Sequence, residues 1–346
     1  MSELRRTLEI RTSPHLESGR RIDTIMFNVV VALAPTVLFG VWAFGLAAVA
    51  VLAASSLGAL VAEALANRSR GLGSTLGDHS ALVTGLLLGL TLPPALPLWM
   101  AAVGGAVAIG LGKALFGGLG FNPFNPALVG RAFLQAAFPV AMTSWSTPFA
   151  AGRFASLPSS TVAFPFAEPV YDALGGATPL AAWKFARQAA DVGDLALGFV
   201  SGSTGETSAL LILAGGAYLV ARNFMSWRTP LAIFATVAAL AAALHFADPA
   251  RYASPAFMLT SGGLALGAVF MATDMVTSPI TPRGTWIYGV VIGALVVVIR
   301  TWAGMPEGVM YAVLLGNALA PHLDRFTQPR VYGTGGATAT AKGSAT

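Results

Sequence analysis

Cysteine is absent from this chain of 346 residues, and charged side chains make up only 10% of it. The lack of thiols excludes disulfides, thiolate zinc sites and iron–sulfur clusters held by cysteine. The four histidines lack metal-ligand spacing, and no Walker loop, catalytic triad or paired-carboxylate motif is present. The net charge of +5 is scattered along the chain, which argues against nucleic-acid binding. A redox role would therefore need a bound or covalently attached organic cofactor.

Apolar residues dominate instead: the chain is 55% hydrophobic with a mean hydropathy of +0.71. Uncharged runs of about 17–25 residues recur, the length that crosses a hydrocarbon core. The polar, Arg-rich residues 1–23 do not resemble a cleaved signal peptide. The sequence predicts an all-α integral membrane protein with about ten transmembrane or half-membrane helices. The expected segments are 24–44, 46–66, 80–92, 96–115, 125–138, 207–222, 229–247, 256–273, 286–303 and 308–323.

The third and fifth segments are short for a full span, so we expect half-helices or helices buried in the bundle. The second-half segments are expected to be more regular. With the N-terminus in the cytoplasm, Arg131 falls inside a helix and most Lys and Arg side chains face the cytoplasm, as the positive-inside rule requires. The outer side receives only Arg153, Lys184, Arg187, Arg251 and Arg300.

A weak internal repeat links Thr91-Leu-Pro-Pro to Thr277-Ser-Pro-Ile, and Gly130-Arg-Ala to Gly316-Asn-Ala. Both pairs are offset by the same interval, which predicts two inverted repeats of five segments each, unless the likeness is a chance similarity of apolar sequence. The predicted organisation is a cytoplasmic segment 1–23, a first repeat 24–138, an outer loop 139–206, a second repeat 207–323 and a cytoplasmic, disordered tail 324–346.

The outer loop contains Asp172-Ala-Leu-Gly-Gly176-Ala177-Thr178-Pro-Leu. Thr178 offers a hydroxyl between small residues, where a bulky group could approach the backbone closely. An ordinary turn before a short helix is the alternative, because Gly-Gly and Thr-Pro are common breakers.

Two further clusters of polar residues and prolines are expected on the inner side. Asn122-Pro-Phe-Asn125-Pro, with Arg131 one turn into the next helix, could receive a hydrogen-bonding or anionic ligand, or could simply kink the chain. A guanidinium buried in a bundle normally pairs with an acid, a carbonyl or a ligand. Thr273-Asp274-Met-Val-Thr277 could bind a flavin edge or cap the next helix.

Glu206 and Thr207 open the sixth expected segment. They predict either an N-cap with an acid in the first helical turn, or a cofactor contact at the outer surface beside Thr178.

Taken together, these motifs resemble a known family. The ordered series is Ser13-Pro-His with Gly19-Arg-Arg, Gly117-Gly-Leu-Gly-Phe-Asn-Pro-Phe-Asn-Pro-Ala with Val129-Gly-Arg-Ala-Phe, Asp172 to Leu180, Gly205-Glu-Thr-Ser-Ala-Leu, Met271-Ala-Thr-Asp through Gly284, and Val313-Leu-Leu-Gly-Asn-Ala-Leu. Over about residues 5–330 the chain resembles the D subunit of the Rnf electron-transport complex. That subunit is related to the B subunit of the sodium-translocating NADH:quinone reductase.

The resemblance implies that Thr178 carries FMN through a phosphoester, attached by a flavin transferase outside the cytoplasm, with Asp172, Gly176 and Ala177 completing the attachment motif. Gly175 stands where the family has serine. The similar Gly-Gly-Ala-Thr338 in the tail lacks the aspartate, so we expect it to stay unmodified.

The resemblance also implies a multi-pass membrane protein of the bacterial cytoplasmic membrane that works with the A, B, C, E and G subunits of Rnf. The complex would transfer electrons between ferredoxin and NAD, coupled to Na⁺ or H⁺ movement. A second, non-covalent riboflavin could lie near Asn122, Asn125, Asp274 and Thr277. The predicted fold, with two inverted repeats of five segments, resembles urea-transporter-like proteins. The competing hypothesis is a transporter or channel subunit without its own redox group.

Overall fold

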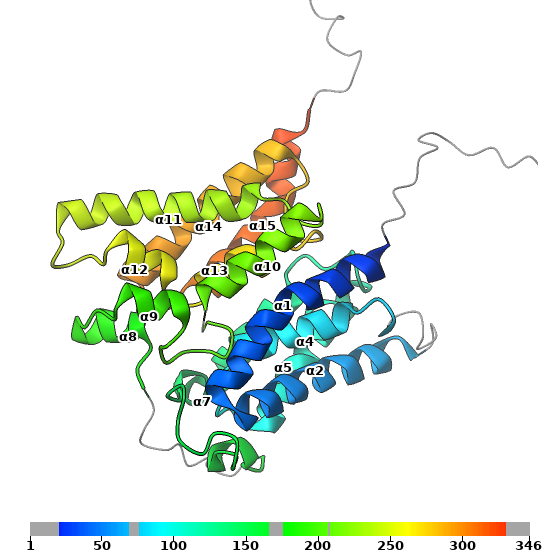
Figure 1. The fold of residues 1–346 in the computed structure, drawn as a ribbon. Coiled ribbons are helices and arrows are strands. Elements are labelled where there is room, and N and C mark those ends of the chain that lie inside the picture. The colour runs from blue at the N-terminus through cyan, green and yellow to red at the C-terminus, as the bar shows by residue number, and fades with distance from the viewer. Residues whose placement is uncertain (1–20, 69–75, 166–175, 207, 330–346) are drawn as a thin grey trace, which may run out of the picture.

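A computed structural model describes residues 21–68, 76–165, 176–206 and 208–329, and these residues form helices and connections with no strand (Figure 1). The α-helices are α1 (Ile22–Phe44), α2 (Leu46–Ala66), α4 (Ser80–Thr91), α5 (Leu98–Gly112), α6 (Pro126–Ala137), α7 (Pro139–Thr143), α8 (Pro179–Ala181), α9 (Val192–Leu197), α10 (Ala209–Ala221), α11 (Arg228–Ala247), α12 (Pro255–Thr260), α13 (Leu264–Leu266), α14 (Pro282–Trp302) and α15 (Val309–Thr327). Short 3₁₀ turns η2 (Ala114–Phe116) and η3 (Ser159–Val162) and π-helical turns η4 (Ala182–Ala186) and η5 (Gly267–Met271) complete them.

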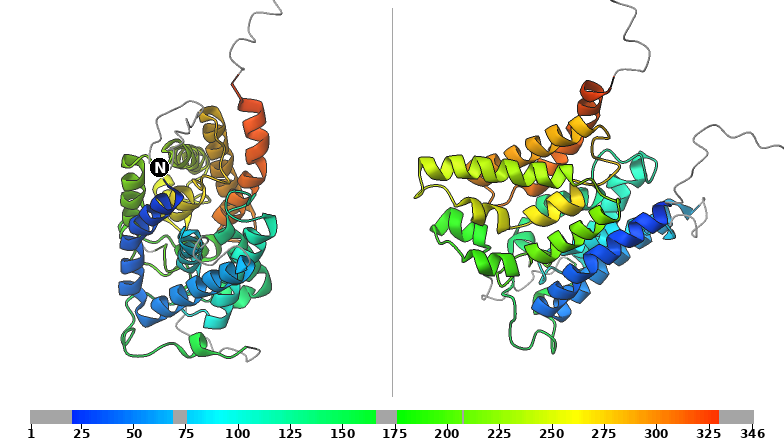
Figure 2. Two further views of the ribbon diagram at one scale, coloured as in Figure 1. Left: turned by 90° about the vertical axis from the view of Figure 1, so that its right-hand side faces the viewer. Right: turned by 45° about the horizontal axis from the view of Figure 1, so that its top comes forward.

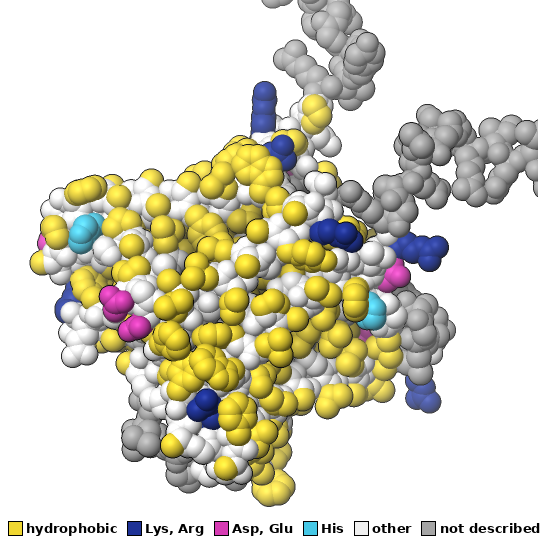
Figure 3. Space-filling model, in the orientation of Figure 1, with side chains coloured by type: hydrophobic (Ala, Val, Ile, Leu, Met, Phe, Trp, Pro, Cys, Tyr) yellow, Lys and Arg dark blue, Asp and Glu magenta, His cyan; other side chains and the backbone are white. Residues whose placement is uncertain are grey.

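Five helical stretches are long and apolar enough to cross a membrane, among the residues that the structure describes. They are Ile22–Phe44, Leu46–Ala66, Leu98–Phe116, Arg228–Ala247 and Pro282–Trp302. Large apolar side chains such as Leu38 and Leu65 are each 68% exposed, which suits contact with lipid. Apolar atoms cover most of the face shown in Figure 3, and the charged side chains lie mainly toward its edges. The chain is a multi-pass membrane protein, although ten membrane segments stay a prediction.

The expected short segments are confirmed, since α4 and α6 contain 12 residues each. The expectation of more regular second-half segments is wrong. The apolar stretch 256–273 is broken between α12 and α13, where Gly262 adopts a φ of +64°. A Cβ on Gly262 would lie 2.6 Å from Leu180 Cδ1, so the break depends on glycine.

The two halves of the chain pack in the same order. In the first half α2 contacts α4 and α5, and α5 contacts α6; in the second, α11 contacts α12 and α14, and α14 contacts α15. Small residues allow the central pairs to approach closely: a Cβ on Gly105 of α5 would lie 2.1 Å from Ser55 O of α2. Contacts of α1 with α10, and of α6 with α15, join the halves. The inverted relation between them stays a prediction.

The start of α1 and the end of α15 lie on the same side of the molecule, whereas α8 and α9 lie on the opposite side (Figures 1 and 2). This arrangement separates the Thr178 segment from the ends of the described bundle.

Candidate cofactor site

The connection between α9 and α10 folds back into the bundle to meet the end of α4. Because α4 is short, its last carbonyl groups lie inside the protein and need donors. Gly205 N donates to Leu90 O at 2.6 Å, and Thr204 N donates to Leu92 O at 3.3 Å. A Cβ on Gly205 would lie 2.7 Å from Leu90 Cβ, so the approach requires a small residue. These bonds fix the backbone immediately before Glu206.

Glu206 is therefore buried, 9% exposed, and precedes the N-cap Ser208 of α10. The expectation of an acid in the first turn of α10 is wrong, because the connection turns inward before the helix begins. A cofactor contact of Glu206 stays a prediction. Thr207 lies outside the described residues.

Glu206 belongs to a buried cluster of two acids and two arginines. Arg131 Nη1 lies 3.9 Å from Glu206 Oε1, and Arg131 Nη2 lies 3.7 Å from Glu307 Oε2. Arg300 Nη2 lies 3.7 Å from Glu307 Oε1. Glu307 also accepts a hydrogen bond from Gly263 N at 2.6 Å, at the break between α12 and α13. Of the three kinds of partner expected for Arg131, the structure thus shows acids.

The two acids titrate differently. Burial and the neighbouring Glu307 carboxylate raise the pKa of Glu206 to about 8, against the opposing effect of Arg131. Burial alone would raise the pKa of Glu307, but Arg131 and Arg300 together lower it below its ordinary value. Near neutral pH the cluster therefore contains two guanidinium cations, one ionised carboxylate and one mostly protonated carboxyl group. Its net positive charge favours an anionic neighbour.

Thr178 shares a cavity of about 90 Å³ with this cluster. Its hydroxyl accepts a hydrogen bond from Ala181 N at 3.2 Å and caps α8. Arg131 and Glu307 line the same cavity, together with Gln135, Met142, Thr143, Trp145, Met305, Pro306, Met310 and Tyr311. The cavity thus combines aromatic and thioether walls, a cation and the Thr178 hydroxyl.

The remaining residues of the attachment motif differ in placement. Gly176 is half-buried, and a Cβ there would lie 2.5 Å from Ser201 Oγ, so a larger residue would require the Ser201 side chain to move. Ala177 is exposed. Asp172 and Gly175 lie outside the described residues.

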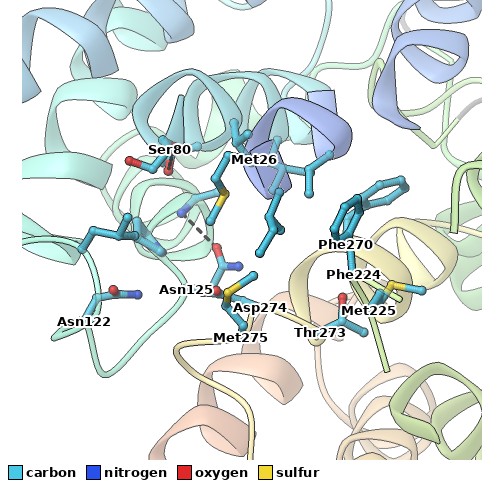
Figure 4. Close-up of a pocket in the computed structure, with 18 of the residues that line it drawn as sticks. Met26, Ser80, Asn122, Asn125, Phe224, Met225, Phe270, Thr273, Asp274 and Met275 are labelled. Carbon is cyan, nitrogen blue, oxygen red and sulfur yellow. Dashed lines mark hydrogen bonds between the residues drawn. The ribbon is translucent and has the colours of Figure 1, made fainter. Parts of the chain in front are cut away.

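The inner polar residues form a separate cavity of about 90 Å³. Asn122, Asn125, Thr273 and Asp274 line it beside a group of apolar side chains (Figure 4). Asn125 Oδ1 accepts hydrogen bonds from Ala127 N and Leu128 N, which caps α6, and Asn125 Nδ2 donates to Met271 O at 3.3 Å.

Thr277 and Asn122 differ in how their polar groups are satisfied at this inner cavity. Thr277 is buried and donates to Asp274 Oδ2 at 3.3 Å, which places its hydroxyl behind the carboxylate. The buried Asn122 Oδ1 has no hydrogen-bond partner among the described residues. The structure thus brings together the two inner clusters expected from the sequence, but it places Arg131 in the other cavity, beside Thr178.

Sequence reasoning misses Glu307 and the deep position of Arg300, which it assigns to the outer-side charges. Lys113 is also deeply buried, with an exposed fraction of 2%. Lys113 Nζ donates to Glu63 Oε2 at 2.9 Å and to Ser80 Oγ at 2.7 Å. The sequence does contain a signal for Glu307 and Arg300. Glu307 is an acid in a short connection between two apolar helices, and such an acid normally pairs with a cation.

Comparison with known proteins gives consistent results. A family model described as the NQR2, RnfD, RnfE family matches residues 9–333. The chain is 40% identical over 335 residues to the D subunit of the proton-translocating ferredoxin:NAD(+) oxidoreductase complex of Clostridium ljungdahlii, covering 94% of this chain and 96% of that protein. It is 44% identical over 328 residues to the D subunit of the ion-translocating oxidoreductase complex of Stutzerimonas stutzeri, covering 90% and 92%. The corresponding protein of Halorhodospira halophila is 40% identical over 347 residues, covering 94% and 95%.

Proposed function

Because the chain belongs to the NQR2, RnfD, RnfE family, we propose that it is the flavin-carrying membrane subunit of an ion-translocating oxidoreductase complex. The complex transfers electrons between ferredoxin and NAD⁺, as the name of the Clostridium ljungdahlii relative states for its own complex. Electron transfer is coupled to movement of Na⁺ or H⁺. The subunit does not act as an enzyme alone.

The proposed attachment site is Thr178 Oγ1, joined to FMN through a phosphoester. The observation that carries this proposal is the cavity that Thr178 shares with Arg131. Arg131 provides positive charge beside a phosphate or the flavin edge, and Trp145 and Tyr311 provide flat apolar walls. Bound there, FMN supplies one-electron and two-electron transfer, whereas the protein sets its position and surroundings.

The test is covalent flavin on the purified chain, produced in a host that contains the flavin transferase. We expect the parent to give a fluorescent band on a denaturing gel and a Thr178 peptide heavier by one FMN. Thr178→Ala should lose both signals. Thr143→Ala, which changes another threonine of the same cavity, is the matched control and should keep both. A dark parent band contradicts the flavoprotein assignment, and fluorescence in Thr178→Ala contradicts the attachment site.

We also propose the inner cavity as the place for a second flavin, riboflavin held without a covalent bond. Support comes from the unpartnered Asn122 Oδ1, which can accept a hydrogen bond from a ligand N–H, and from the mixed polar and apolar walls. Denaturing the parent should release riboflavin, and Asn122→Leu should release much less while keeping the covalent fluorescence at Thr178. Equal release from both proteins contradicts this placement.

The proposed location is the bacterial cytoplasmic membrane, with both termini in the cytoplasm and Thr178 on the outer face. Supporting this orientation, α8 lies on the side opposite to the start of α1 and the end of α15. The partners are the A, B, C, E and G subunits of Rnf, the lipid bilayer, and the flavin transferase during maturation. Labelling of an introduced cysteine at exposed Ala177 by a membrane-impermeant reagent in intact cells tests the orientation; labelling only after lysis contradicts it.

The second candidate function is a transporter or channel subunit without its own redox group. The helix break between α12 and α13 favours it, because interrupted helices often build ion or substrate sites in transporters. The same gel experiment separates the two, since this alternative requires a dark parent band.

A further inference from the structure

A second cavity, of about 140 Å³, lies where η4 meets the ends of α11 and α14. Its charged lining residues are Lys184, Arg187, Arg251 and Arg300, and no Asp or Glu is among its described lining residues. These are four of the five cations that the predicted topology assigns to the outer side. We call this space the outer cationic cavity. Outer-side cations are disfavoured in membrane proteins, so gathering nearly all of them in one cavity indicates a binding role.

Lys184 forms one wall of the outer cationic cavity, and all three of its hydrogen-bond donors are used. Its ammonium group donates to the carbonyl oxygens of Arg300, Ala303 and Met305, which closes the C-terminal end of α14. Burial lowers the pKa of Lys184 from its ordinary value. Lys184 therefore adds positive charge to the cavity but has no donor left for a ligand.

Arg187 and Arg251 hold most of the available donors. Arg187 has a φ of +57°, a left-handed conformation that costs energy for a residue with a Cβ. Its Nη1 donates to Arg251 O at 2.7 Å, and its guanidinium lies 5.8 Å from the centre of the Trp183 ring. The Arg251 guanidinium lies 5.6 Å from the Tyr252 ring and makes no hydrogen bond or ion pair with a described residue.

Arg300 lies at the inner wall of the cavity. Its Nη1 donates to Met258 O at 2.7 Å and its Nη2 to Ser261 O at 2.9 Å, but its buried Nε has no partner among the described residues. The acid that faces Arg300 is Glu307, which Arg131 shares. A buried guanidinium N–H that lacks a hydrogen-bond acceptor lowers the stability of the protein, unless an anion accepts a hydrogen bond from it.

We propose that the outer cationic cavity binds the phosphate of a membrane phospholipid headgroup. Guanidinium groups match phosphate oxygens in geometry and charge. The cavity lies at the ends of two long apolar helices, and Trp302, which lines it, is 56% exposed. Phe246 at the end of α11 is 83% exposed. Exposed aromatic rings at helix ends are typical of the membrane interface, which favours a lipid over a free phosphate ion as the source.

The test measures phospholipid that stays bound to the purified full chain after extensive detergent washing, detected by native mass spectrometry. We expect the parent to retain phosphatidylglycerol, and the double variant Arg187→Gln/Arg251→Gln to retain about tenfold less, equivalent to about 1.4 kcal/mol. Arg153→Gln, which removes the fifth outer cation outside the cavity, is the matched control and should retain as much as the parent. The double variant Arg187→Lys/Arg251→Lys should keep part of the binding.

A phosphate competition and a melting-temperature measurement distinguish the possible outcomes. Inorganic phosphate at millimolar concentration should leave the lipid bound; displacement would assign the site to free phosphate and overturn the lipid proposal. An unchanged melting temperature of the glutamine variant shows that it folds, and equal lipid retention by that variant and the parent overturns the proposal. This experiment does not depend on flavin, because Thr178→Ala should retain the same lipid as the parent.

Discussion

Replacing Glu307 and Glu206 by glutamine, one at a time, tests the charge assignment of the buried cluster. Glu307 lies 3.7 Å from both Arg131 and Arg300, so its carboxylate is the main counter-charge of two buried cations. Glutamine keeps an oxygen that can accept from Gly263 N but removes the charge. Removing one partner of a buried ion pair costs about 3–5 kcal/mol.

Glu206→Gln should behave differently, because the pKa of Glu206 is raised to about 8 and glutamine resembles the protonated acid. At pH 5 we expect a change below about 1 kcal/mol, within the range of mild substitutions. A raised pKa contributes stability that is fully present below the unfolded-state pKa and is lost as pH rises toward the folded-state value. The parent should therefore lose stability between about pH 4.5 and pH 8, and Glu206→Gln should lose less.

The assay is the apparent melting temperature of the purified chain in detergent, recorded at one scan rate because membrane proteins often unfold irreversibly. With an unfolding entropy of about 2.1 cal/mol/K per residue over 346 residues, a change of about 3–5 kcal/mol corresponds to a shift of about 4–7 °C for Glu307→Gln. Equal shifts for the two variants at pH 5, or a parallel pH dependence of the parent and Glu206→Gln, would refute the assignment of a protonated Glu206 beside an ionised Glu307.

Three further predictions concern other parts of the chain. Peptide mass mapping should find FMN on Thr178 and none on Thr338, since the tail copy of the motif lacks the aspartate; flavin on Thr338 would show that Gly-Ala-Thr alone directs attachment. Lys113→Met should lower the free energy of unfolding by about 3–5 kcal/mol, and the double variant Glu63→Leu/Lys113→Met should recover most of it, as is typical when both members of a buried pair are replaced; a double variant as unstable as the single one contradicts this. Gly262→Ala should lower the melting temperature, because the added Cβ would overlap Leu180 in a left-handed backbone; an unchanged value would mean that the helix break tolerates a side chain.

The helices could largely be predicted from the sequence, because membrane insertion depends on local apolar length. The shortness of α4 and α6 is predictable from the proline-rich boundaries after Thr91 and before Ala127. Ser261, Gly262 and Gly263 interrupt the apolar stretch and could have indicated a break, but the contact of Gly262 with the distant Leu180 is not visible in the sequence.

The candidate site could be predicted only in part. The motif containing Thr178 is local, so the sequence alone identifies it. Its neighbours are not local: Arg131 and Glu307 are far apart along the chain, and no spacing rule relates them. Because Arg131 follows the Asn125 cluster directly in the sequence, sequence reasoning groups it with the inner residues, although the helix that starts at Asn125 carries it toward the other cavity.

The shortness of α4 connects these observations. A half-length helix leaves carbonyl groups inside the bundle, and satisfying them requires a connection that enters from one side. That connection contains Glu206, which is buried 3.9 Å from Arg131 and whose burial favours the protonated, uncharged form. In the second half, at the break between α12 and α13, Arg300 donates to the carbonyl oxygens of Met258 and Ser261. Glu307 accepts there from Gly263 N and also lies 3.7 Å from Arg131. The two interruptions thus converge on one guanidinium, and this guanidinium lines the Thr178 cavity. A substitution of Arg131 would therefore alter contacts made by both halves of the chain.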